Sequence, residues 1–226
     1  MPGYDYIGVG RDDGKQAGEH SAIFTARISS RSWSMAISGY PRSPTVRIKA
    51  GTRSAPYLYV GRVSGQTDRL HFLVLQPSYG PCSVQARAES AKLILKKIKE
   101  FPKRLPAILT GDFNVDQTSE SYKLLDGSGI MRDSYEIADF RYAPNGTFNG
   151  FHPDRKTDSR IDHLFLTKEF EVKKYGILTD TYRSEVKESA QKEQNGNFPK
   201  EVSLSKYEAR TPSDHFPVMI VVEVKD

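Results

Sequence analysis

The chain has 226 residues, 37% of them hydrophobic and 11% aromatic, a length and composition that suit one domain, residues 1–226, with a sizeable core. No apolar run approaches the roughly 20 residues of a membrane-spanning helix, and the single cysteine, Cys82, excludes an internal disulfide. The formal net charge is +5, but residues 27–69 hold eight basic residues against one acidic residue; this segment carries +7 and the remainder −2, which argues against a basic surface across the whole chain.

Two short strands are predicted at the beginning of the chain. Residues 3–10 alternate aromatic or aliphatic residues with small and polar ones, residues 11–15 form a turn, and residues 18–24 form the second strand. The first three residues, Met1-Pro2-Gly3, are not a signal peptide. The default compartment is therefore the cytoplasm, with export of a longer parent protein left open.

Residues 29–83 form an atypical segment. They are rich in Ser, Arg, Gly and Pro and show no sustained period of a helix or a strand. Such a pattern is typical of a loop or of disorder.

A surface helix is predicted over residues 85–101. Lys and Glu residues occupy one side of this stretch, and Pro102 ends it. The opposite side is apolar and is expected to pack on a sheet; its members are Ala88, Ala91, Leu95, Ile98 and Phe101.

The most informative stretch runs from Leu109 to Asn114. The apolar run 107–109 predicts a buried strand, and Gly111 leads from it to Asp112 and Asn114. Side chains two positions apart on an extended backbone share a face. A carboxylate that can bind metal or accept a proton then stands beside an amide that can donate to a phosphate oxygen. The alternative is an ordinary turn, which Asp and Asn both favour.

The second half of the chain contains further short elements. Residues 119–126 predict a helix capped by Thr118 or Ser119, residues 132–141 are weakly helical, and residues 144–151 form a turn and a strand. Residues 161–167 and 218–222 predict buried strands. Between these two strands, residues 179–211 are highly charged and predict a mobile surface loop or a substrate-facing insertion.

Three motifs, in this order, resemble the endonuclease/exonuclease/phosphatase superfamily of divalent-metal phosphoesterases. They are Leu109-Thr110-Gly111-Asp112-Phe113-Asn114, Ser159-Arg160-Ile161-Asp162-His163-Leu164-Phe165-Leu166 and Pro212-Ser213-Asp214-His215-Phe216-Pro217-Val218. The resemblance implies an α/β (α+β) fold, a two-layer β-sandwich flanked by helices. It also implies Mg²⁺, or Mn²⁺, as the cofactor.

The resemblance assigns a role to each matching residue. It implies that Asp112 orients or deprotonates the attacking water and shares the metal with Asp214. Asn114 would bind the phosphate or the metal shell, while His215 would contact the scissile phosphate and be held by Asp162. Two further residues match the family: Asn149 lies in a segment beside the substrate, with a turn as the alternative, and Glu19 matches a supporting Glu, with a surface Glu as the alternative.

The sequence also departs from the family pattern. The family expects, before the first matched strand, an Asn-bearing strand and a metal-binding Glu, so we expect the fold to be incomplete at the N-terminus. Three family motifs are absent from residues 29–83, yet codons written for residues 36–42, 48–53 and 73–82 can be read in another frame to give them. We therefore hypothesise that this segment is a frame-shifted translation. A second alternative is that the chain as given is inactive.

The expected function is hydrolysis of a phosphodiester or a phosphomonoester by a monomer. The substrate would be a phosphate ester, with nucleic acid and a phospholipid headgroup among the candidates, and a general phosphohydrolase is favoured over a DNA-repair enzyme. The competing hypothesis is a non-catalytic remnant or a basic module that binds phosphate or nucleic acid through the Arg-rich segment.

Overall fold

The computed structural model describes residues 3–7, 17, 23–26, 34–36, 45–47, 57–64, 69–76, 83–100, 106–186 and 207–225. Its largest sheet has seven strands in the order β3-β5-β6-β7-β10-β8, and β4 also pairs with β5. These strands are β3 (Ser34–Ala36), β4 (Thr45–Arg47), β5 (Tyr57–Ser64), β6 (Arg69–Gln76), β7 (Ala107–Asp112), β8 (Arg132–Asp133) and β10 (Asp162–Leu166). The order brings together segments that lie far apart in the sequence.

Part of the atypical segment forms regular strands, which corrects the prediction of a loop. β5 and β6 pair as an antiparallel hairpin, and β6 continues the sheet by running parallel to β7. Both strands contain runs of aromatic and aliphatic residues, Tyr57–Val60 and Phe72–Leu75, and such residues favour a pleated sheet even without a clean alternation. Pairing with β7, a contact distant in sequence, supplies what the local pattern lacks.

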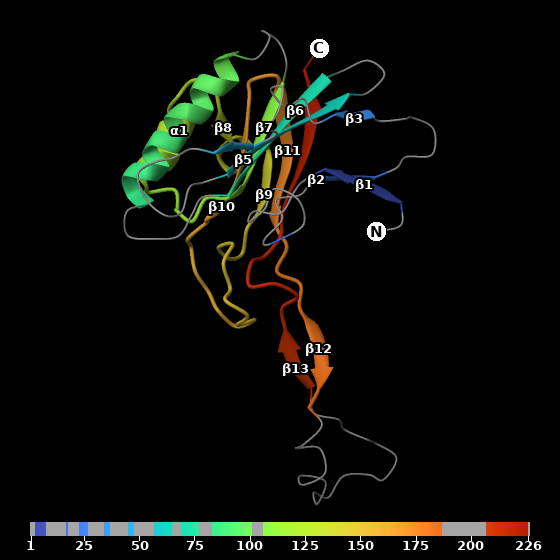
Figure 1. Cartoon of the computed structure of the whole chain (residues 1–226). Helices are drawn as coiled ribbons and strands as arrows, with labels where there is room; N and C mark the ends of the chain where they lie inside the picture. Colours follow the sequence, from blue (N-terminus) through green and yellow to red (C-terminus); the bar gives the residue numbers. More distant parts are fainter. Residues whose placement is uncertain are drawn as a thin grey trace, which may run out of the picture.

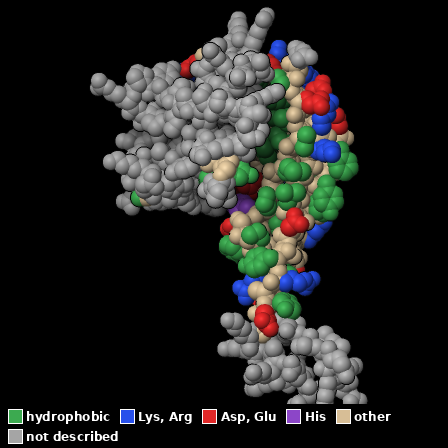
Figure 2. Space-filling view, turned by 90° about the vertical axis from the view of Figure 1, so that its right-hand side faces the viewer, with side chains coloured by type: hydrophobic (Ala, Val, Ile, Leu, Met, Phe, Trp, Pro, Cys, Tyr) green, Lys and Arg blue, Asp and Glu red, His purple; other side chains and the backbone are tan. Residues whose placement is uncertain are grey.

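A second sheet has three strands in the order β14-β11-β9, formed by β14 (Val218–Val224), β11 (Phe170–Ile177) and β9 (Phe140–Tyr142). β11 runs antiparallel to β14 and parallel to β9. Figure 2 shows hydrophobic side chains gathered on the described surface of the molecule beside Lys, Arg, Asp and Glu. The exposed hydrophobic residues of this sheet are Phe140, Tyr142, Met219, Val221 and Val224.

The two faces of the seven-stranded sheet are covered by different layers because side chains alternate along a strand. Leu109 and Phe165 are paired across β7 and β10 and pack with helix residue Ile94. Their neighbours Ile108 and Leu166 point the other way and pack against Phe170 and others of the three-stranded sheet. The result is a two-layer sandwich with the helices of residues 83–100 and 120–126 on one side, the fold class expected from the sequence (Figure 1).

Three helices are present in the described part of the chain: α1 (Ser83–Glu100), α2 (Glu120–Asp126) and α3 (Ser134–Ile137). In α1 the predicted apolar side is buried at Ala88, Ala91 and Ile98. Ser119 caps α2, with its side chain accepting a hydrogen bond from the Tyr122 N–H. Among these helices none has the length and apolar character that crossing a bilayer requires.

Two smaller sheets complete the described structure. β1 (Tyr4–Ile7) pairs with β2 (Ile23–Ala26) near the beginning of the chain, in line with the predicted pair of strands. β12 (Tyr182–Glu185) pairs with β13 (Tyr207–Arg210), and this pair projects from the body of the molecule (Figure 1). The ends of the charged connection 179–211 are therefore an ordered ribbon, which leads directly to residues 211–215.

Candidate active site

Asp112 and Asp162 face each other across two neighbouring strands. Asp112 ends β7, Asp162 begins β10, and the antiparallel register pairs the two residues directly. Directly opposed residues share a face, with Cβ atoms about 4.5–5.5 Å apart. Because Ile108 and Leu166 have the same orientation on these strands, both carboxylates lie at the end of the core between the two sheets. The strand register therefore brings two acids, fifty residues apart in the sequence, to one place.

Asn114 holds the carboxylate of Asp112. Its backbone N–H donates to Oδ1 of Asp112, and its side-chain Nδ2 donates to Oδ2, both at 2.8 Å. Asn114 has a φ of 52°, a left-handed conformation that Asn tolerates better than most residues. This tight turn fixes the orientation of Asp112.

His215 lies beside the two acids and belongs to the segment before β14. Its Nδ1 lies 2.8 Å from Oδ2 of Asp162, and its ring packs edge to face on Phe148 with 5.2 Å between centroids. The segment that carries His215 is held by an isolated β-bridge between His215 and Phe148. Because a carboxylate only accepts, Nδ1 of His215 carries the proton of this hydrogen bond.

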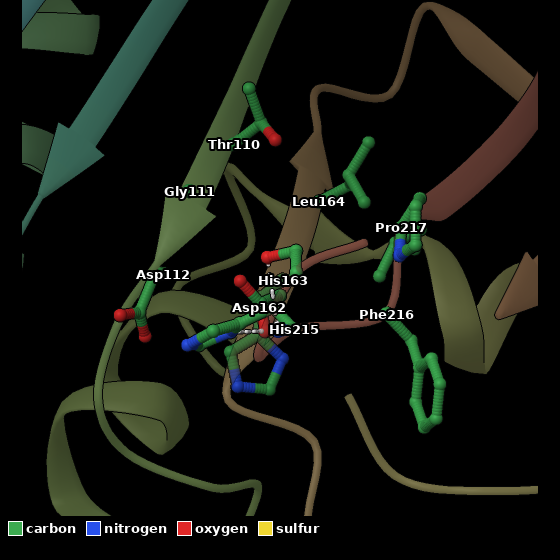
Figure 3. A pocket seen from close by; sticks show the side chains of 11 residues that line it. Thr110, Gly111, Asp112, Asp162, His163, Leu164, His215, Phe216 and Pro217 are labelled. Carbon is green, nitrogen blue, oxygen red and sulfur yellow. Dashed lines mark hydrogen bonds and ion pairs between the residues drawn. The ribbon is translucent and has the colours of Figure 1, made fainter. Parts of the chain in front are cut away.

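Asp112, Asp162 and His215 border a pocket of about 290 Å³. One ligand atom from each of the three lies within 4.8 Å of the others. Figure 3 shows the three side chains converging from β7, β10 and the segment before β14. The pocket also includes Thr110, Gly111, His163, Leu164, Ser213, Phe216, Pro217 and Val218.

The environment of the pocket raises the pKa values of Asp112 and His215. Burial raises the pKa of Asp112 and the charge of Asp162 adds to this, whereas hydrogen bonds from Asn114 act in the opposite direction. The hydrogen bond with Asp162 raises the pKa of His215, against the lowering effect of burial. The negative charge of the two carboxylates is thus partly compensated by His215, and a bound cation would compensate it further.

The donor set fits a divalent cation. Two carboxylates provide the oxygen ligands that Mg²⁺ and Mn²⁺ prefer, commonly completed by water and substrate. His215 already bonds to Asp162 through Nδ1, and Asn114 donates one hydrogen bond to each oxygen of Asp112. A cation would therefore use the remaining lone pairs of Asp112 and the second oxygen of Asp162. These two residues are the candidates to hold the ion.

Asp214, the other predicted metal ligand, is not a member of this cluster of three. Its backbone carbonyl accepts hydrogen bonds from the N–H groups of Asn149 and Gly150, and its Oδ1 lies 3.4 Å from Oγ of Ser213. Its charge nevertheless contributes to raising the pKa of His215. The metal role of Asp214 therefore stays a prediction.

Asn149 and Glu19 differ in how far the structure describes them. Asn149 is fully buried, its Oδ1 accepts from the Phe151 N–H and from Thr211 Oγ1, and it does not line the pocket. Its observed contacts are those of a residue that holds the turn beside His215, and contact with substrate stays a prediction. Glu19 lies outside the described residues.

Thr147 is a supporting residue for which sequence reasoning assigned no role. Its buried Oγ1 accepts hydrogen bonds from the N–H groups of Ile161 and Asp162, at 2.9 and 3.1 Å. It thereby fixes the start of β10, where Asp162 stands. Its place in the Thr147-Phe148 pair, before a Gly-containing turn, was the signal in the sequence.

Comparisons with known proteins identify the family of this chain. The family model described as "Endonuclease/Exonuclease/phosphatase family" matches residues 30–215, and a comparison with curated protein sequences found no match. A solved endonuclease/exonuclease/phosphatase family protein from Bacteroides thetaiotaomicron is 45% identical with a TM-score of 0.76, covering 100% of this chain and 75% of that one.

Two further solved structures are similar. A mannosyl-6-phosphatase from the same bacterium is 45% identical, with a TM-score of 0.75 and coverage of 99% of this chain and 78% of that one. An endonuclease/exonuclease/phosphatase from Bacteroides vulgatus is 26% identical, with a TM-score of 0.66 and coverage of 99% and 77%. From the match over most of its length, the opposed acids and the neighbouring histidine, this chain belongs to the endonuclease/exonuclease/phosphatase family of phosphoesterases.

Proposed function

We propose that this protein hydrolyses phosphate esters with the help of a divalent cation, Mg²⁺ or Mn²⁺, held by Asp112 and Asp162. The observation that carries the proposal is the direct pairing of these two carboxylates across β7 and β10, with His215 completing the cluster. When bound there, a divalent cation would neutralise charge on the phosphoryl oxygens and stabilise the leaving alkoxide.

The side chains of this chain supply the remaining steps. Asp112 is held by Asn114 in one orientation, and burial raises its pKa, which makes it a stronger base for orienting and deprotonating an attacking water. Asn114 positions this group, and contact of its amide with a phosphate oxygen is part of the proposal.

His215 stabilises the phosphoryl group. Asp162 accepts a hydrogen bond from Nδ1–H, so the imidazole is held in one orientation and Nε2 is the atom left for the substrate. A raised pKa keeps more of the ring protonated near neutral pH, and a protonated Nε2–H donates to a phosphate oxygen or to the leaving group. Asp214 is proposed as a further carboxylate near the cation.

We propose a phosphomonoester on a sugar as the substrate class. The support is the 45% identity to a mannosyl-6-phosphatase along 99% of this chain. A sugar hydroxyl is the leaving group in such a reaction, and its developing alkoxide is the charge that the protonated His215 and the cation would stabilise.

The test is phosphate release by the purified chain. Mannose 6-phosphate and bis(p-nitrophenyl) phosphate, a phosphodiester, are supplied with Mg²⁺, with Mn²⁺ and with a chelator. The proposal expects metal-dependent release from the sugar phosphate, loss of that activity in Asp112→Ala and lower activity on the diester. Glu89→Gln, which alters only an exposed ion pair on α1, serves as the matched control and should behave as the unaltered chain does.

A metal-independent rate, or equal activity in Asp112→Ala, would contradict the assignment of the site. A preference for the diester would contradict only the proposed substrate class.

A further inference from the structure

His163 is a buried histidine on the opposite face of β10 from Asp162. Consecutive side chains on a strand point to opposite faces, and the side chain of His163 is fully buried. It lies among three aromatic rings, 5.5 Å from Phe113, 4.9 Å from Tyr122 and 5.7 Å from Phe165 between centroids. By its packing alone it is an ordinary member of the core beneath the helices.

The polar contact of His163 leads to the candidate active site. Its Nε2 lies 3.0 Å from the backbone carbonyl of Val115. A carbonyl only accepts, so Nε2 donates the proton of this hydrogen bond. Nδ1 lies 3.8 Å from Oδ2 of Asp133 and has no hydrogen-bond partner among the described residues. The one hydrogen bond of this buried ring therefore goes to the turn that follows Asp112.

Val115 follows Asn114, which is the residue with left-handed backbone that holds both carboxylate oxygens of Asp112. On the other side of this turn, the N–H of Phe113 donates to the carbonyl of Ile161 at 2.8 Å. The turn is thus tied to β10 at two points, by the residue before Asp162 and by the residue after it. Both ties define where Asp112 stands relative to Asp162.

We propose that His163 is a positioning residue for the reaction: by donating to Val115, it keeps the Asn114 turn, and through it the Asp112 carboxylate, in place. The role rests on the proposed function, because the carboxylate it positions is the proposed metal and water ligand. The role is indirect, because the side chain of His163 is fully buried.

Two substitutions separate positioning from packing. His163→Phe keeps an aromatic ring among the three neighbouring rings but cannot donate to Val115. His163→Gln retains an N–H donor on a side chain of similar reach. Tyr122→Phe is the matched control, because Tyr122 is a buried aromatic neighbour of His163 whose hydroxyl bonds to Asp133 instead of Val115.

The expected result is a fall in kcat of about 10- to 100-fold in His163→Phe, with KM little changed and the fold retained. His163→Gln should recover most of this loss, and Tyr122→Phe should lower the melting temperature without lowering kcat. Unchanged kcat in His163→Phe, or equal losses of kcat in His163→Phe and Tyr122→Phe, would overturn the proposal.

A second measurement does not depend on activity. In nitrogen-15 NMR spectra of the unaltered chain, His163 should show a proton on Nε2, and the side-chain amide signals of Asn114 should shift in His163→Phe but not in Tyr122→Phe. If the unaltered chain releases no phosphate, the proposed function fails and these signals alone decide the positioning role. A neutral His163 with its proton on Nδ1, or unmoved Asn114 signals, would refute it.

Discussion

Asp133 and Arg160 form a buried ion pair beneath the candidate site, and replacing Asp133 by Asn tests what this pair contributes. Nη1 of Arg160 lies 2.8 Å from Oδ2 of Asp133, and the side chains are only 6% and 1% exposed. The same oxygen accepts from the Tyr122 hydroxyl at 2.7 Å. Removing the Asp133 charge leaves the buried guanidinium with only the half-exposed Glu136 as an acidic partner, at 3.2 Å, and breaking a buried pair in this way costs about 3–5 kcal/mol.

An ion pair of the same length at the surface serves as the reference for the loss expected in Asp133→Asn. Lys92 and Glu89 also lie 2.8 Å apart, but their side chains are 55% and 53% exposed. Solvent screening leaves such a pair with little net contribution to stability. Asp133→Asn should therefore lower the free energy of unfolding several times more than Glu89→Gln.

The assay is urea unfolding followed by circular dichroism, with thermal unfolding beside it. For a chain of this size, 3–5 kcal/mol corresponds to a fall in melting temperature of about 6–20 °C. Equal losses in Asp133→Asn and Glu89→Gln would refute the reasoning that burial, rather than distance, decides the contribution of an ion pair here.

The pH dependence of this loss follows from the pKa of Asp133. Burial by itself raises this pKa, but the neighbouring His163, the guanidinium of Arg160 and the Tyr122 hydroxyl bring it below its ordinary value. The stability that the ionised carboxylate contributes is therefore present above the unfolded pKa of about 3.9 and is lost as pH falls through the lower folded pKa. The difference between the unaltered chain and Asp133→Asn should stay constant near neutral pH and shrink only in acid.

Three further predictions concern the site. Asp112→Asn should abolish metal-dependent activity yet raise the melting temperature of the metal-free protein, because burial and Asp162 disfavour the charge of Asp112; a lower melting temperature would contradict this. Asp162→Asn should lower kcat by about 100-fold or more and, in a metal-free NMR titration, lower the pKa of His215, whose rise comes chiefly from the hydrogen bond with Asp162. The stability from that pair is fully present below the unfolded pKa of His215 and is lost as pH rises through the raised folded value, so the two proteins should converge at alkaline pH, and divergence there would be inconsistent with the pair. Gly146→Ala should destabilise the protein by about 1–3 kcal/mol in urea unfolding, since the added Cβ would lie 2.2 Å from the carbonyl oxygen of Ser159; an unaffected midpoint would argue against this packing.

The elements that the sequence predicted well are those in which a local pattern and the final environment agree. The run before Gly111 is apolar because β7 is buried on both faces, and the apolar side of α1 has a helical period because only that side meets the sheet. β5 and β6 were missed because β6 depends on pairing with β7 and β5 on pairing with β6, and Gly, Ser and Arg residues around them obscure the pattern. Whether residues 29–83 are frame-shifted is a property of the gene, and the coding DNA decides it.

For the candidate site, the sequence indicated the residues that stand in short motifs but not the contacts that hold them. Asp112, Asp162 and His215 stand in short motifs that could be matched to a family, and the strand register brings them together. The roles of Thr147 and His163 depend on which backbone groups lie opposite them after folding. For Thr147 the Thr147-Phe148 pair was a signal in the sequence, whereas no spacing encodes the contact of His163 with Val115, which only the structure could reveal.

The central claim, that Asp112 and Asp162 form a divalent-cation site, is tested most directly by anomalous diffraction from crystals grown with Mn²⁺. The account predicts an anomalous peak bonded to a carboxylate oxygen of Asp112, and its loss in crystals of Asp112→Asn. A manganese ion bound only elsewhere on the chain, or one that persists between β7 and β10 in Asp112→Asn with unchanged occupancy, would contradict it.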